Sequence, residues 1–159
     1  MHKKDFMLKN PIIKNILSAV AVVGFGFVLL NLTFIFFAAV GFLITFLVPG
    51  GLEAVQSWIG PVSFAVSTLF IAIFSWLIFR SGWPTLVKAI YMTVPTAVVL
   101  VLDGILFYRW PIIANSIGTL LVLATLYFFY RTEQPWLYFF SVILVSLALL
   151  IMGLSGTEI

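Results

Sequence analysis

The stretch ILSAVAVVGFGFVLLNLTFIFFAAVGFLITFLV, residues Ile16–Val48, contains no charged side chain. A helix needs about 20 mostly apolar residues to cross the hydrocarbon core of a bilayer. At about 1.5 Å per residue, this stretch is near 50 Å long, against a core of about 30 Å. It predicts a first membrane helix that is either long and tilted or broken near Asn31 and re-entrant. Pro49, Gly50 and Gly51 then end it, because such residues break helices.

The rest of the chain shares this apolar composition. Of its 159 residues, 64% are hydrophobic and 8% are charged, whereas soluble domains carry roughly 25% charged residues. A soluble fold this short could not bury so much apolar surface, so the excess must face lipid. We therefore expect an all-α integral membrane protein, a single domain over residues 1–159, in a plasma or inner membrane.

The N-terminal residues Met1–Asp5 resemble the positively charged region of a signal peptide. The apolar run that follows is too long for such a peptide, and it contains no short core that ends in a small-residue cleavage site. We expect the run to be retained as the first membrane helix.

Further apolar stretches of spanning length follow, and Pro, Gly, Trp and Arg residues separate them. Before the second span, Leu52, Val55 and Ile59 share one helical face, with Glu53 and Gln56 away from it. This pattern predicts a short interfacial helix over residues 52–59. The predicted membrane spans are residues 16–48, 61–79, 86–108, 112–130 and 136–154.

The basic residues orient this five-span helix bundle. With the N-terminus in the cytoplasm and the C-terminus outside, seven of the eight basic residues are cytoplasmic and only Arg109 is outside. Cytoplasmic loops are enriched in Lys and Arg, which favours this orientation. A re-entrant first run would make six spans and split the basic residues five against three, so five spans are preferred.

Asp103 is the one acidic residue inside a predicted span. It stands between the apolar runs Val98–Leu102 and Ile105–Phe107, where an acid costs free energy and needs a partner, a wet cavity or a function. Such a residue is the first candidate for a functional site.

A tight turn between the third and fourth spans would make them an antiparallel hairpin, with Asp103 level with residues 115–118. Asn115 or Ser116 could then donate a hydrogen bond to Asp103, and Arg109 could reach back from the turn. Two interpretations stay open. The first is a structural polar cluster, and the second is a binding site for a substrate, a proton or another cation.

Pro95 lies inside the third predicted span. Proline removes a backbone hydrogen bond and commonly kinks a helix, and the hydroxyls of Thr93 and Thr96 could satisfy the freed carbonyls. The kink is open to a packing interpretation and to an interpretation as a gating hinge.

The sequence offers little for enzyme chemistry. It has no cysteine, and its one histidine, His2, lies outside the spans. There is no Ser–His pair, no pair of intramembrane aspartates, no metal triad of His and carboxylates, and no phosphate-loop motif. We expect no enzyme activity, no cofactor and no metal. The basic residues form no dense patch, so we expect no nucleic-acid partner.

These features favour a small transport or channel-type protein, or the membrane subunit of a transporter, for a small solute or ion. Asp103, Pro95 and rows of Ser and Thr in the second span motivate this expectation. The alternatives are a non-catalytic accessory subunit of a larger membrane complex and a binder of lipid or another hydrophobic small molecule. Since a small bundle has little room for a pathway, the expected partners are membrane lipids and either further copies of the chain or another membrane protein.

Overall fold

The computed structural model describes residues 10–49, 56 and 58–154. In this part of the chain, all regular structure is helical. Each of the five helices is long and apolar enough to cross a membrane, which confirms the predicted all-α bundle. The helices are α2 (Pro11–Leu47), α4 (Ile59–Arg80), α5 (Thr85–Leu106), α6 (Pro111–Arg131) and α7 (Trp136–Leu154).

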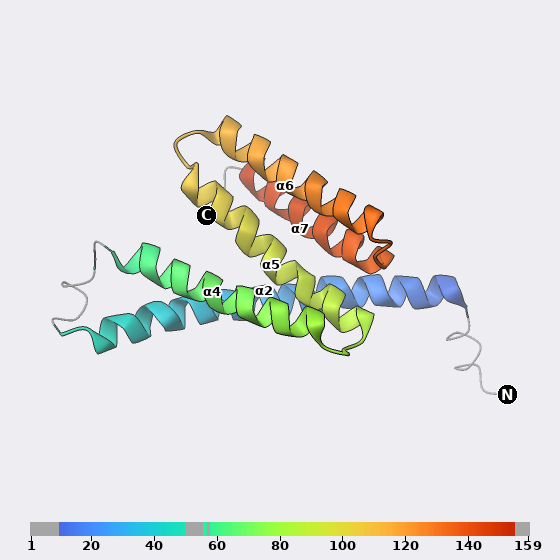
Figure 1. Ribbon diagram of the computed structural model, residues 1–159, viewed down its shortest axis with the longest axis horizontal. Coiled ribbons are helices and arrows are strands. Elements are labelled where there is room, and N and C mark those ends of the chain that lie inside the picture. The colour runs from blue at the N-terminus through green and yellow to red at the C-terminus, as the bar shows by residue number, and fades with distance from the viewer. Residues whose placement is uncertain (1–9, 50–55, 57, 155–159) are drawn as a thin grey trace.

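α2 is one uninterrupted helix of 37 residues, so the long-helix alternative holds and the re-entrant alternative is wrong. Asn31 does not break it, because its side-chain amide donates to the carbonyl of Phe27, one turn earlier, at 2.8 Å. At about 1.5 Å per residue α2 is roughly 55 Å long. Its N-terminal part projects past the other helices (Figure 1).

α2 begins at Pro11 rather than at Ile16 because the preceding residues favour a helix start. The side chain of Asn10 accepts a hydrogen bond from the backbone N–H of Ile12 at 3.0 Å, and Pro11 occupies the first helical position. Proline is well suited there, because its missing N–H would have had no partner within the helix.

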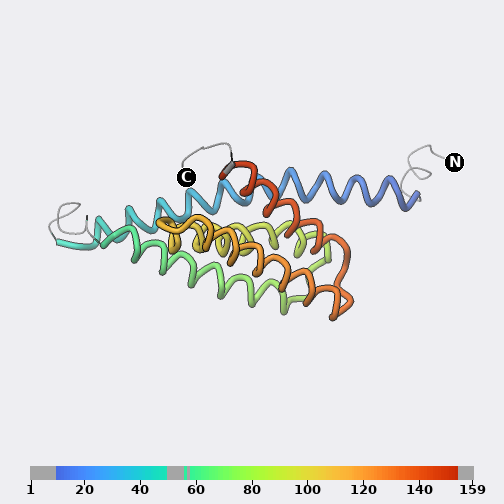
Figure 2. Tube along the Cα trace, turned by 90° about the horizontal axis from the view of Figure 1, so that it is seen from above, coloured from blue at the N-terminus to red at the C-terminus, as the bar shows by residue number. Residues whose placement is uncertain are grey.

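α5 is the central helix of the bundle. It packs against α2, α4, α6 and α7. Figure 1 shows it crossing between α2 and the pair formed by α6 and α7, and in Figure 2 it lies among the other helices. Its buried face carries mostly small residues, which allow close helix contact where lipid supplies no hydrophobic driving force. These buried residues are Ala89, Thr93, Val94, Ala97, Val98 and Asp103.

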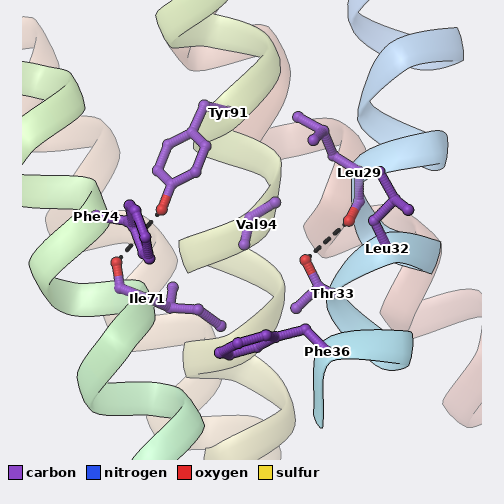
Figure 3. A pocket seen from close by; sticks show the side chains of 8 residues that line it. All are labelled: Leu29, Leu32, Thr33, Phe36, Ile71, Phe74, Tyr91 and Val94. Atoms are coloured by element: carbon purple, nitrogen blue, oxygen red, sulfur yellow. Dashed lines mark hydrogen bonds between the residues drawn. The ribbon is translucent and has the colours of Figure 1, made fainter. Parts of the chain in front are cut away.

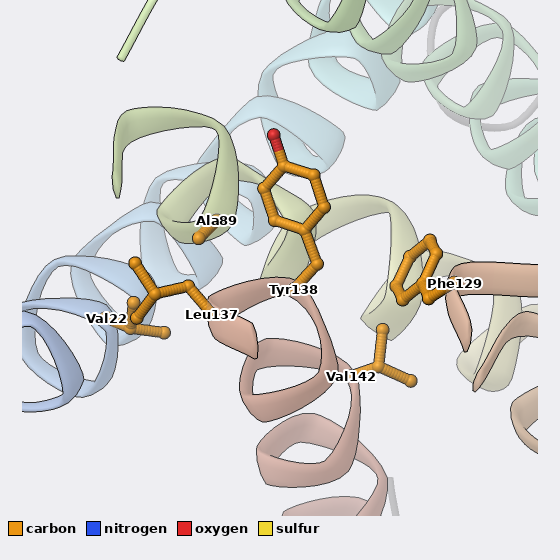
Figure 4. Packing of buried hydrophobic residues seen from close by; sticks show 6 residues of the cluster. All are labelled: Val22, Ala89, Phe129, Leu137, Tyr138 and Val142. Atoms are coloured by element: carbon orange, nitrogen blue, oxygen red, sulfur yellow. The ribbon is translucent and has the colours of Figure 1, made fainter. Parts of the chain in front are cut away.

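Two clusters of buried apolar side chains hold the helices around α5. One cluster joins Ile71, Val94 and Val98, with Leu29 and Phe37 packed against it. The other cluster brings together side chains from α2, α5, α6 and α7 (Figure 4). It comprises Val22, Ala89, Phe129, Leu137, Tyr138 and Val142.

A buried hydroxyl links α7 to α5. The side chain of Ser141 is fully buried, and its Oγ lies 2.7 Å from the carbonyl oxygen of Ala89 and 2.9 Å from that of Leu137. Ala89 has no side chain beyond Cβ, so the α5 backbone is open to this donor. The bond to Ala89 is therefore a polar contact between helices inside the apolar core.

Lys88 closes the connection between α4 and α5. Its ammonium group donates to the carbonyl oxygens of Phe79 at 3.0 Å and of Ser81 at 2.6 Å, at the C-terminal end of α4. The last carbonyls of a helix lack partners and carry partial negative charge, so a lysine there is favourable. In the same last turns of α4, the guanidinium carbon of Arg80 lies 5.2 Å from the centre of the Trp76 ring.

The predicted interfacial helix over residues 52–59 falls mostly outside the described residues, and α4 itself starts at Ile59. The interfacial helix stays a prediction.

The contact between α2 and α5 at Gly26 should be sensitive to one added methyl group. A Cβ on Gly26 would lie 2.9 Å from Cγ2 of the buried Thr93, whereas a Cβ on Gly24 would meet nothing within 4 Å. We expect Gly26→Ala to lower the free energy of unfolding by about 1–3 kcal/mol. Gly24→Ala should be neutral or slightly stabilising. Unfolding in mixed micelles measures both, and equal stabilities would contradict the packing described here.

Removal of the Ser141 hydroxyl should destabilise the α5–α7 contact. Hydrogen bonds between membrane helices contribute about 0.6–1.7 kcal/mol, so Ser141→Ala should lose stability in this range. Ser146→Ala is the matched control, because its hydroxyl donates only within α7, to the carbonyl of Val142 at 2.7 Å. The same unfolding measurement applies, and an equal loss in both variants would rule out an interhelical role for Ser141.

Candidate functional site

Asp103 lies in the last turn of α5, and its side chain is only 7% exposed. Its backbone carbonyl continues the helix by accepting from the N–H of Phe107 at 3.0 Å. In the carboxyl group, Oδ1 is buried and has no hydrogen-bond partner. Leaving a buried polar group unpaired costs about 1–3 kcal/mol. The site is therefore a buried acid with an unused acceptor oxygen.

Gly118 of α6 makes the space that the Asp103 carboxyl group occupies. A Cβ on Gly118 would lie 3.1 Å from Oδ2 of Asp103 and 3.6 Å from Cδ2 of Leu100. A larger residue at this position would push against the carboxyl group. By contrast, a Cβ on Gly104, next to Asp103 on α5, would meet nothing within 4 Å.

The predicted antiparallel hairpin of α5 and α6 is present, but it brings Asp103 to Gly118 rather than to Asn115 or Ser116. The side chains of Asn115 and Ser116 are both exposed, and the Ser116 hydroxyl donates within α6 to the carbonyl of Ile112 at 2.7 Å. Ser116 is two residues from Gly118, about 200° around the helix. Asn115 lies one turn nearer the start of α6. The structure shows neither of the hydrogen bonds expected between these residues and Asp103.

Arg109 lies in the connection between α5 and α6, and its side chain is exposed. Among the described residues it forms no ion pair with Asp103. The carboxyl group therefore has neither a basic partner nor a side-chain donor in the part of the chain that the structure describes.

Pro95 lies within α5, which continues through it from Thr85 to Leu106. The carbonyl that loses its helical partner is that of Tyr91, four residues earlier. The hydroxyls of Thr93 and Thr96 donate to the carbonyls of Ile90 and Met92, at 2.7 and 2.8 Å. They thus bind the carbonyls on either side of the freed one. A hinge at Pro95 stays a prediction.

The row of small polar residues in α4 contains two buried hydroxyls without partners. Ser67 is fully buried, and neither its Oγ nor Oγ1 of Thr68 has a hydrogen-bond partner. Ser63 and Ser75 instead donate to carbonyls of their own helix, those of Gly60 and Ile71. Only part of this row is therefore satisfied within α4.

Tyr91 forms a polar contact between α4 and α5 that was not predicted from the sequence. Its hydroxyl donates to the carbonyl of Ile71 at 3.3 Å and lies 3.3 Å from Oγ of Ser75. A tyrosine inside an apolar helix was the available signal, because a buried tyrosine hydroxyl usually finds a partner.

Tyr91 also lines a cleft of about 180 Å³ between α2, α4 and α5 (Figure 3). Its hydroxyl and that of Thr33 are both directed to backbone carbonyls, so they are already satisfied. The remaining lining is apolar and aromatic. These side chains are Leu29, Leu32, Phe36, Ile71, Phe74 and Val94.

No protein-family model, curated protein or solved structure matches this chain.

Proposed function

We propose that this chain is a small integral membrane transport protein and that Asp103 binds its proton or small cation. The observation that supports this proposal is the buried carboxyl group whose Oδ1 has no hydrogen-bond partner. Acids inside membrane bundles commonly mark ion pathways and proton relays. We also propose that the protein has no catalytic activity.

The surroundings of Asp103 favour binding over a purely structural role. A structural polar cluster would supply a basic side chain or a side-chain donor, and the described residues supply neither; only the backbone of Gly118 interacts with the carboxyl group. Of the described acids, Asp103 and Glu133, only Asp103 lies in a helix. A cation or a proton on the carboxyl group would provide the missing partner.

Access to Asp103 would be shortest from the end of the bundle where α5 meets α6, because the residue lies in the last turn of α5. Toward the N-terminal end of α5, the helix is closely packed through Val94 and Val98. Passage of an ion would therefore require a movement of α5, in which Pro95 lies, or a pathway between copies of the chain.

We also propose that α2 begins in the cytoplasm and that α7 ends outside, in a plasma or inner membrane. Lys14, Arg80, Lys88 and Arg131 lie in the first or last turns of their helices. Figure 1 shows these helix ends toward one end of the bundle and the connection between α5 and α6, which carries Arg109, at the other. This distribution agrees with the positive-inside rule.

A second candidate function rests on the cleft in Figure 3. Its walls are apolar and its hydroxyls are already satisfied, so its chemistry suits a lipid acyl chain or a similar hydrophobic molecule. Many apolar side chains of α2 are exposed, so in a membrane this cleft would open toward lipid.

Asp103→Asn should abolish transport without unfolding the protein, because the amide has nearly the same size but cannot carry the charge. The measurement is flux of H⁺, Na⁺ and K⁺ into liposomes that contain the purified full chain. Glu133→Gln is the control, since it removes the same charge from an exposed residue outside the helices. Unchanged flux in folded Asp103→Asn, or no flux of any of the three ions in the folded wild type, would refute the proposal.

A larger side chain in the cleft of Figure 3 tests the proposed binding of a lipid acyl chain. Leu32→Trp places a larger side chain in the cleft, and Leu43→Trp adds the same bulk to an exposed position of α2 outside it. We expect Leu32→Trp to lose phosphatidylethanolamine that co-purifies with the wild type, as measured by native mass spectrometry. Equal retention by both variants would exclude the cleft as the lipid site.

A further inference from the structure

A recess of about 550 Å³ lies at the end of the bundle where α2, α5 and α7 begin. It is far from Asp103, which lies at the opposite end of α5. Lys14, Asn15 and Ser18 of α2 line one side, and Thr85 and Trp136 line the others. The proposed function does not use this recess.

The polar side chains of the recess have no side-chain partner among the residues that the structure describes. Lys14 forms no ion pair in the part of the chain that the structure describes, and Asn15, Ser18 and Thr85 form no side-chain hydrogen bonds there. None of the described side chains that line the recess is acidic. The recess therefore presents one cation and three hydrogen-bonding side chains without an opposing charge, which suits an anion with several acceptor oxygens.

The backbone adds to this charge. None of the three helices that begin at the recess has an acidic residue in its first turn, and α5 has no side-chain cap. The first N–H groups of a helix lack internal partners and carry partial positive charge. They increase the preference for an anion that Lys14 establishes.

The apolar wall of the recess indicates which anion fits. Leu86 and Leu137 line it together with Trp136, an amphipathic residue enriched at the headgroup level of membranes. A ligand that contacts both the polar and the apolar walls needs an anionic group with several acceptor oxygens and a hydrocarbon chain, and a phospholipid carries both. A free phosphate ion would leave the leucines uncovered.

We propose that this recess binds the headgroup of an anionic phospholipid, with the phosphate at Lys14, Asn15 and Thr85 and the start of the acyl chains against Leu86 and Leu137. The expected cytoplasmic position of this end agrees with the anionic lipids of cytoplasmic leaflets. The proposal is independent of transport by Asp103.

Native mass spectrometry of the full chain tests this site, with phosphatidylglycerol and phosphatidylcholine as lipid probes. We expect phosphatidylglycerol to be retained in preference, and Lys14→Gln to weaken its binding about fivefold. Lys14 is exposed, so the variant should fold. The matched control is Arg131→Gln, which removes one positive charge from the same end of the bundle but outside the recess.

Three outcomes would overturn the proposal. The first is an equal loss of phosphatidylglycerol binding in Lys14→Gln and Arg131→Gln, because diffuse surface charge would then explain the binding. The second is equal retention of the two lipids by the wild type. The third is displacement of phosphatidylglycerol by millimolar inorganic phosphate, because the recess would then be a site for the free anion. A loss of phosphatidylglycerol binding in Lys14→Gln alone, with no displacement of the lipid by inorganic phosphate, supports the lipid site.

Discussion

The structure depends on one constraint, the absence of water that could satisfy polar groups inside a bilayer. Backbone groups are therefore paired within helices, and most hydroxyls bind carbonyls. Thr33 and Ser75 do so within their own helices, while Ser141 binds the carbonyl of Ala89 on α5. α5 is central because its small buried residues let four neighbours approach it. Packing and hydrogen bonding thus place the same helix at the centre.

The exceptions to this rule are the positions on which the proposed function rests. Oδ1 of Asp103, Oγ of Ser67 and Oγ1 of Thr68 are the buried side-chain oxygens without partners among the described residues. An unpaired hydroxyl costs less than an unpaired carboxyl group, so Asp103 carries the stronger argument for a ligand. Its position against Gly118 also shows that the bundle makes space for the carboxyl group rather than excluding it.

The helices were predictable from sequence, whereas the contacts of the site were not. Apolar length alone identifies five spans, because a bilayer requires it, and Asn10 with Pro11 explains the early start of α2. That Gly118 faces Asp103 was not predictable, because equal counting from a turn fixes height along a helix but not rotation about it. The cleft and the recess each combine residues from three helices, so no single segment indicates them.

We propose that the five helices cross a membrane, with the lysine-bearing end of the bundle in the cytoplasm. The chain has no cysteine, so single cysteines can be introduced at Arg109 and Thr132, on either side of α6. Labelling with an impermeant maleimide in sealed cells measures which side each occupies. We expect Arg109→Cys to be labelled from outside and Thr132→Cys only after permeabilisation. Labelling of both from the same side would contradict a spanning α6, and the reverse pattern would contradict the orientation.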